Sequence, residues 1–216
     1  MDEREFFYRR LPHWHPPNAI FFVTFRLDGS LPRSVVAQLQ DEYEREKRLL
    51  EMLPSEQRNA AQYNTYKRAF ARYDHALDQA DGPRWLADPR IAQTVDKELH
   101  ALHPQYYLLL AYCIMPNHVH LLLSLEGIIR PAIRADGTQY SALSQALWLL
   151  KGRTGHLCQK ILGQHGRFWS RESYDHVVRD EREFARILEY IVNNPVKAGL
   201  VTDWQDWSYT YVDPDL

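Results

Sequence analysis

The sequence predicts an α+β fold in which an antiparallel sheet carries helices on one face, and three observations favour it. Residues 18–27 alternate in character with the period of a strand. Residues 106–125 form two apolar runs separated by a proline and an asparagine, and residues 33–102 show apolar side chains at helical spacing. The length of 216 residues fits a single domain, 1–216, with a helical insertion at about 33–102.

The first strand is expected over 18–27, where Phe21, Val23 and Phe25 share one face. The following segment, 33–102, carries tyrosines and other apolar residues three and four positions apart, which is typical of an amphipathic helix. Packing between helices explains such a stripe, and a surface on which bases stack is the alternative.

The next two strands are expected over 106–114 and 118–125. YYLLLAYCI is apolar on both faces, which indicates a strand covered on both sides. Pro116 and Asn117 supply the turn chemistry between the two runs, so the pair is predicted to form a hairpin.

A helix, a strand and a second helix are predicted after the hairpin. Leucines at helical spacing indicate a helix over roughly 140–161, and 167–179 reads as a short strand. Asp180 followed by a glutamate three residues later is typical of a helix start, and Pro195 is expected to end that helix.

The composition predicts a globular cytoplasmic protein. Apolar residues make up 45% of the chain, the apolar runs are too short to cross a membrane, and the first ten residues do not resemble a secretory signal. Cys113 and Cys158 lack metal-ligand spacing and read as reduced core residues. The net charge of −2 is unfavourable for nucleic acid, but residues 130–200 carry eleven basic and seven acidic side chains.

Two histidines in the third strand are the first candidate for chemistry. His118 and His120 are two residues apart, so they share one face of the strand. A buried imidazole needs a partner, and one divalent ion would satisfy both. Hydrogen bonds to carboxylates or to the backbone are the alternative, and the spacing alone does not decide between them.

The last helix supplies a second group of polar residues. Tyr190 and Asn194 are four residues apart and therefore stack on one face, with Arg186 one turn earlier. Asn194 could bind an ion through its carbonyl oxygen. A half-buried Tyr190 and an Asn194 that caps the helix before Pro195 form the structural alternative.

The motifs MPNHVHLLL (115–123) and EYIVNNPVKAGLV (189–201) together resemble the HUH single-tyrosine transposases, and most of all the REP-associated tyrosine transposases of bacteria. Further matches are RRLPHW, FFVTFRL, FWSRESYDHVVRD and DWQDWSY. The resemblance covers about 1–30 and 104–209, and it assigns no function to the helical insertion at 33–102.

The resemblance implies a ferredoxin-like HUH fold and a reaction. His118, His120 and Asn194 would hold Mg²⁺ or Mn²⁺, although related transposases often carry glutamine in place of the asparagine. Tyr190 would attack the scissile phosphate of single-stranded DNA, leaving a 5′-phosphotyrosine and a free 3′-hydroxyl that allow rejoining. Tyr174 is the competing nucleophile, and a structural role is preferred for it because no ligand lies four residues away.

The resemblance implies a partner as well, namely single-stranded DNA with hairpin or palindromic repeats, acted on at the bacterial nucleoid by a monomer or a homodimer. Basic groups contact phosphates, and exposed aromatic side chains stack on unpaired bases. Phe168 and Trp169 are candidates for stacking or for the core. The residues expected to contact DNA are Lys151, Arg153, Arg167, Arg171, Arg179, Arg186 and Lys197.

Two other functions stay open at this point. A nucleic-acid-binding module could keep the fold without the chemistry, and a metal-dependent hydrolase could use water in place of the tyrosine. The presence of His118, His120, Tyr190 and Asn194 together favours a transposase that nicks and rejoins DNA.

Overall fold

The structure, a computed structural model, describes residues 18–128 and 141–216. The RRLPHW match at residues 9–14 and most of the connection before the fourth long helix lie outside the described residues. The chain divides into two compact units. The sheet unit comprises the residues up to Leu27 together with Trp85–Leu216, and the hairpin unit comprises Asp28–Arg84.

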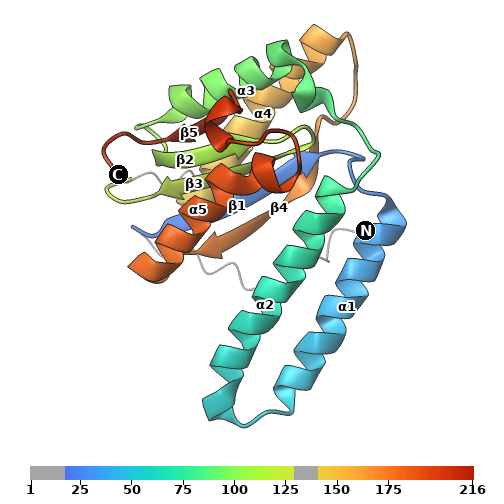
Figure 1. The fold of residues 1–216 in the computed structure, drawn as a ribbon, viewed down its shortest axis with the longest axis vertical. Coiled ribbons are helices and arrows are strands. Elements are labelled where there is room, and N and C mark those ends of the chain that lie inside the picture. The colour runs from blue at the N-terminus through green and yellow to red at the C-terminus, as the bar shows by residue number, and fades with distance from the viewer. Residues whose placement is uncertain (1–17, 129–140) are drawn as a thin grey trace, which may run out of the picture. The chain divides into compact units, whose positions relative to one another are not determined.

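The sheet unit is built on five strands that pair in the order β4-β1-β3-β2-β5, with every neighbouring pair antiparallel (Figure 1). The strands are β1 (Ile20–Leu27), β2 (Leu108–Ile114), β3 (His118–Ser124), β4 (Trp169–Val177) and β5 (Thr210–Val212). Within the sheet unit, which leaves out the two helices of Asp28–Arg84, the first four strands and the two long helices between them follow the ferredoxin-like order β-α-β-β-α-β. The expected antiparallel α+β fold is confirmed.

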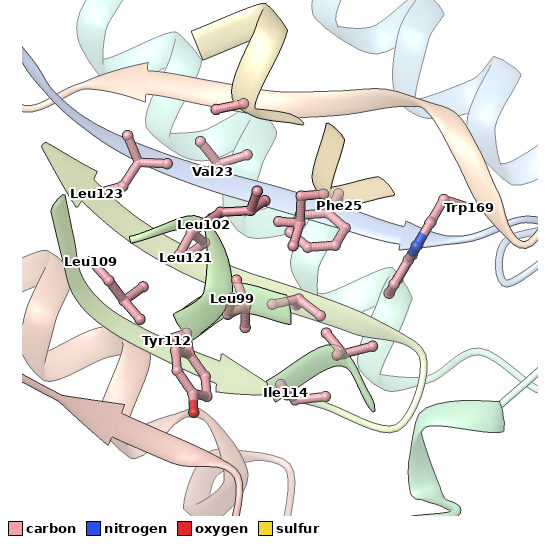
Figure 2. Close-up of a cluster of buried hydrophobic side chains, with 14 of the residues drawn as sticks. Val23, Phe25, Leu99, Leu102, Leu109, Tyr112, Ile114, Leu121, Leu123 and Trp169 are labelled. Atoms are coloured by element: carbon pink, nitrogen blue, oxygen red, sulfur yellow. The ribbon is translucent and has the colours of Figure 1, made fainter. Parts of the chain in front are cut away.

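Helices lie on both faces of this sheet. One face packs against α3 (Pro89–Leu102) and α4 (Ala142–Leu162) and forms the main core, part of which is drawn in Figure 2. The other face meets α5 (Glu181–Lys197), where Tyr190 contacts Phe22 and His120. The expectation of helices on one face is therefore corrected for α5. Because β3 is buried along its whole length, both of its faces need cover.

The main core takes in two aromatic residues that were candidates for base stacking. Phe168 and Trp169 are 3% and 4% exposed. Trp169 packs edge-on against Phe25 and donates its indole N–H to the Thr154 hydroxyl at 2.8 Å, while Phe168 stacks on Trp85. Both side chains belong to the core, so they do not form a stacking surface.

The hairpin unit consists of α1 (Arg33–Glu51) and α2 (Ser55–Asp78). Tyr73 and Leu77, from the expected aromatic stripe, pack in an apolar cluster with Val36 of α1. This part of the stripe is a contact between helices. The insertion expected at 33–102 extends too far, because α3 packs in the core of the sheet unit.

No helix within the described ranges is both long and apolar enough to span a lipid bilayer.

The helix α5 begins where the sequence predicts but ends later than predicted. Asp180 caps the helix by accepting the Glu183 N–H at 2.8 Å, as the sequence predicts. Pro195 does not end the helix, which continues to Lys197 and is followed by Gly199 at a φ of 67°. A proline removes only one helical hydrogen bond, and the Ala198 N–H still reaches the Asn194 carbonyl at 3.0 Å.

A buried carboxylate fastens the start of α5 to β4. Glu183 is 3% exposed, and it accepts from His176 Nε2 at 3.0 Å and from the Arg179 backbone N–H at 3.0 Å. Glu183→Ala should lower the free energy of unfolding by about 2–3 kcal/mol, because buried donors lose a charged acceptor. Urea unfolding would measure the change. Glu181→Ala, an exposed change in the same helical turn, should stay within about 0.5 kcal/mol.

Candidate metal and nucleophile site

His118 and His120 lie on the α5 face of the central strand β3. Their side chains are 1% and 0% exposed. The two Nε2 atoms are 3.0 Å apart, and the rings meet edge to face with centroids 4.6 Å apart. Two imidazole nitrogens therefore converge on one point beneath the helix that covers this face.

The Nδ1 atom of each histidine is held by a second polar side chain. His118 Nδ1 lies 2.6 Å from the amide oxygen of Asn117, the preceding residue. His120 Nδ1 lies 2.8 Å from the hydroxyl of Thr24, the residue that pairs with it across the β1–β3 ladder. With both Nδ1 atoms in hydrogen bonds, the Nε2 atoms are the ones turned toward each other.

Tyr190 of α5 packs directly on this pair. Its ring meets His120 edge-on, with centroids 5.3 Å apart and an interplanar angle of 69°, and it also meets Phe22 of β1 at 5.9 Å. The Lys197 ammonium lies 4.6 Å from the centroid of the Tyr190 ring, a cation–π contact. The tyrosine is half-buried, and its hydroxyl oxygen is shielded from solvent.

Asn194, one helical turn after Tyr190, is 1% exposed. Its side-chain oxygen Oδ1 is buried and makes no hydrogen bond to the described residues. Asn194 therefore does not cap the helix through this oxygen, because the helix continues past it. A buried carbonyl oxygen without a donor costs roughly 1–3 kcal/mol, so its presence calls for an explanation.

The donor set fits a divalent cation. Two neutral imidazoles and an amide oxygen are ligand types that Mg²⁺ and Mn²⁺ accept. The two Nε2 atoms form a hydrogen bond with each other and are placed to bind one ion, and the unsatisfied Asn194 Oδ1 is a feature that such an ion would explain. The side chains that could hold it come from β3 and from α5.

Tyr174 lies on the same face of the sheet, on strand β4, the neighbour of β1. It pairs with Thr24 on the opposite side from His120, and its ring meets Phe22 at a centroid distance of 6.1 Å. Phe22 thus contacts both tyrosine rings. Tyr190 has a ring contact to His120, a histidine of the pair.

Three of the residues expected to contact DNA make contacts within the protein. Lys151 donates to the Arg171 carbonyl at 3.1 Å and to the Ser173 hydroxyl at 3.0 Å. The Arg153 guanidinium pairs with Glu98 of α3 at 3.6 Å. Arg179 pairs with the buried Glu183 at 3.2 Å. A structural role competes with phosphate binding at each of them.

The other four basic residues are exposed, and the Arg186 guanidinium donates to the Arg182 carbonyl at 3.2 Å. Arg167 and Arg171 flank the start of β4, and Arg186 and Lys197 lie on α5. The Lys197 ammonium reaches the Tyr190 ring. The structure therefore brings at least this expected basic residue to the tyrosine.

Lys151 gives a prediction for pH dependence. Burial lowers the pKa of its ammonium from 10.5 to about 8. Between these values the unfolded chain binds the proton and the folded chain does not, so stability rises with pH in that window. Relative to Lys151→Met, the free energy of unfolding of the wild type should rise by on the order of 3 kcal/mol between about pH 8 and pH 10.5.

Urea unfolding of both proteins at several pH values would measure this gain. Lys160→Met, an exposed change near the end of the same helix, is the matched control. A difference between wild type and Lys151→Met that stays constant from pH 8 to pH 10.5 would contradict the prediction.

Two polar residues of this site were not predicted from the sequence. Asn117 was interpreted only as a turn residue, although it stands next to His118. Thr24 lies 96 residues before His120, and its role depends on the pairing of β1 with β3. Strand alternation does place Thr24 on the face opposite Phe25, but the partner strand had to be known.

Comparison with known proteins gives two curated relatives from Haemophilus influenzae, and no family model matches the chain. One is named "Putative REP-associated tyrosine transposase" and is 34% identical over 111 residues, which are 49% of this chain and 59% of the relative. The other is an uncharacterized protein, 27% identical over 94 residues, with 39% and 52% covered. The chain thus spans between half and three fifths of these relatives.

A solved structure of a REP-associated tyrosine transposase bound to a REP hairpin superposes with a TM-score of 0.48. It shares 15% sequence identity and covers 91% of this chain and 78% of its own. At the level of sequence, the resemblance that the two motifs predict is confirmed, because the chain is similar to a relative of that name.

Proposed function

We propose that this chain, which is similar in sequence to a REP-associated tyrosine transposase, is a metal-dependent DNA strand-transfer enzyme with Tyr190 as its nucleophile. It cleaves single-stranded DNA near a hairpin through a 5′-phosphotyrosine and rejoins the strand to a new end. The observation that carries the proposal is the packing of the Tyr190 ring on His120, where two imidazole nitrogens converge.

In the proposed reaction, the Tyr190 oxygen attacks the phosphorus atom and the bond from phosphorus to the 3′-oxygen breaks. The phenol loses its proton to solvent, and the leaving 3′-oxygen gains one. The phosphotyrosine keeps the energy of the phosphodiester, so a second 3′-hydroxyl can reverse the step on another strand.

His118, His120 and Asn194 are the residues that would hold the cation. Mg²⁺ or Mn²⁺ bound there would supply Lewis-acid polarisation of the scissile phosphate. The surrounding residues serve the same step: Phe22 and His120 fix the ring of Tyr190, and the ammonium of Lys197 favours negative charge close to that ring.

The proposed substrate is single-stranded DNA that contains a hairpin, and the proposed place of action is the bacterial nucleoid. The expected DNA contacts are Arg167, Arg171, Arg186 and Lys197, which are all exposed, together with Lys151, Arg153 and Arg179. The latter three are held by Ser173, Glu98 and Glu183.

A covalent-trapping assay tests the proposal. Purified protein is mixed with Mn²⁺ and single-stranded DNA that is labelled at its 3′ end and carries palindromes from beside its own gene, and the products are run on a denaturing protein gel. We expect a labelled band at the mass of the protein plus the cleaved strand, and no such band with EDTA or with the fully duplex DNA.

Other results would select the alternatives. Cleavage with Mn²⁺ but without any adduct would favour a hydrolase that uses water. Binding of hairpin DNA without cleavage, across several such substrates, would favour a nucleic-acid-binding module.

A further inference from the structure

The geometry points to Thr24 and Asn117 as positioning residues that orient His120 and His118 for a divalent cation. The inference rests on the proposed function, because it concerns the cation that the two histidines would hold. Neither residue would touch the cation. Each acts through the Nδ1 atom of one imidazole.

Asn117 determines which nitrogen of His118 carries the proton. An amide oxygen only accepts hydrogen bonds, so the 2.6 Å contact requires the proton of a neutral His118 to sit on Nδ1. Its lone pair then lies on Nε2, the atom that faces His120. A metal ligand needs this lone pair, so Asn117 keeps His118 in the tautomer that can bind a cation.

Thr24 holds the second ring in a different way. A hydroxyl both donates and accepts, so the 2.8 Å contact to His120 Nδ1 persists with either tautomer of the imidazole. The antiparallel pairing of Thr24 with His120 fixes the distance between the two side chains. Rotation of the His120 ring away from His118 would break this buried hydrogen bond, which opposes the rotation.

Thr24 and Asn117 are both buried, so the loss of either contact should weaken cation binding. Thr24 is 0% exposed and Asn117 is 5% exposed, so water cannot readily replace a lost partner. Loss of such an outer partner typically weakens metal binding 10- to 100-fold. The same site therefore has two inner imidazoles and two outer groups that fix them, from β1 and from the turn before β3.

Calorimetric titration with Mn²⁺ tests the role of Thr24. Thr24→Val keeps the shape and removes the hydroxyl, while Thr24→Ser keeps the hydroxyl. We expect roughly 10- to 100-fold weaker Mn²⁺ binding for Thr24→Val and a change within about threefold for Thr24→Ser. Equal Mn²⁺ affinity in wild type and Thr24→Val would overturn the inference while leaving the proposed function intact.

Nuclear magnetic resonance tests Asn117 without any metal. Long-range ¹H–¹⁵N spectra of protein labelled with ¹⁵N-histidine report which ring nitrogen carries the proton. We expect the Nδ1–H form for His118 in the wild type and a mixture of tautomers in Asn117→Ala. An Nε2–H form of His118 in the wild type would overturn the inference, even if the variants fail to fold.

Failure of the proposed metal site can be distinguished from failure of the positioning role alone. A wild-type protein that binds no Mn²⁺ would remove the proposed metal site together with the role of its positioning residues. A wild-type protein that binds Mn²⁺ and forms the covalent adduct, with Thr24→Val equal to it in both, would remove only the positioning role.

Discussion

Tyr190→Phe should reduce the covalent protein–DNA adduct at least about 10³-fold, because the substitution removes the one oxygen that the proposed reaction needs. The ring contacts should survive, since a phenylalanine ring can meet His120 and Phe22 in the same edge-on arrangement. The free energy of unfolding should therefore change by less than about 1 kcal/mol. Mn²⁺ binding should be unaffected as well, because the phenol is not among the expected ligands.

Tyr174→Phe is the matched control for this experiment. Tyr174 lies on the same face of the sheet and meets the same Phe22, at a centroid distance of 6.1 Å. We expect its adduct to form at the wild-type level in the trapping assay. An adduct that persists in Tyr190→Phe and disappears in Tyr174→Phe would move the nucleophile to β4. Cleavage that persists without an adduct would instead assign the attack to water.

Asn194→Leu should stabilise the metal-free protein and abolish its metal-dependent activity. The buried Oδ1 has no hydrogen-bond donor among the described residues, and leucine has nearly the same shape without a polar atom. We expect the free energy of unfolding to rise by about 1–2 kcal/mol in the presence of EDTA. Mn²⁺ binding should weaken at least tenfold, and the adduct should be lost with it.

Asn193→Leu serves as the control for the change in side-chain type. The Asn193 side chain donates to the Glu189 carbonyl of the same helix at 3.0 Å, away from the histidine pair. It should leave both Mn²⁺ binding and the adduct near the wild-type level. Urea unfolding with EDTA and calorimetry with Mn²⁺ measure the two effects separately. A loss of stability in Asn194→Leu would show that the oxygen has a structural partner and would contradict its assignment as a ligand.

Most strands and helices could be predicted because their signals are local. The alternation around Val23 predicts β1, and the apolar runs on either side of Pro116 predict the β2–β3 hairpin within two residues at each end. Asp180 marks the start of α5 correctly. Pro195 is an exception, because the sequence predicts that the helix ends there. The helix continues to Lys197 through hydrogen bonds that do not involve the proline nitrogen.

Part of the candidate site could likewise be predicted from local signals, and part could not. The shared face of His118 and His120 follows from the two-residue period of a strand, and the shared face of Tyr190 and Asn194 follows from helical spacing. That the tyrosine meets the histidine could be expected only from the family resemblance. That Thr24 holds His120 could not be expected at all, since it depends on which residues of β1 and β3 are in register.

The sequence by itself determined the period of each element, and therefore which side chains share a face, because neighbours along the chain set these geometries. Only the tertiary structure decided which faces meet. It placed α5 on the face opposite α3 and α4, placed α3 in the core, and turned Phe168 and Trp169 inward. These outcomes depend on strand order and register, which arise from packing between residues far apart in the chain, and no local pattern encodes such packing.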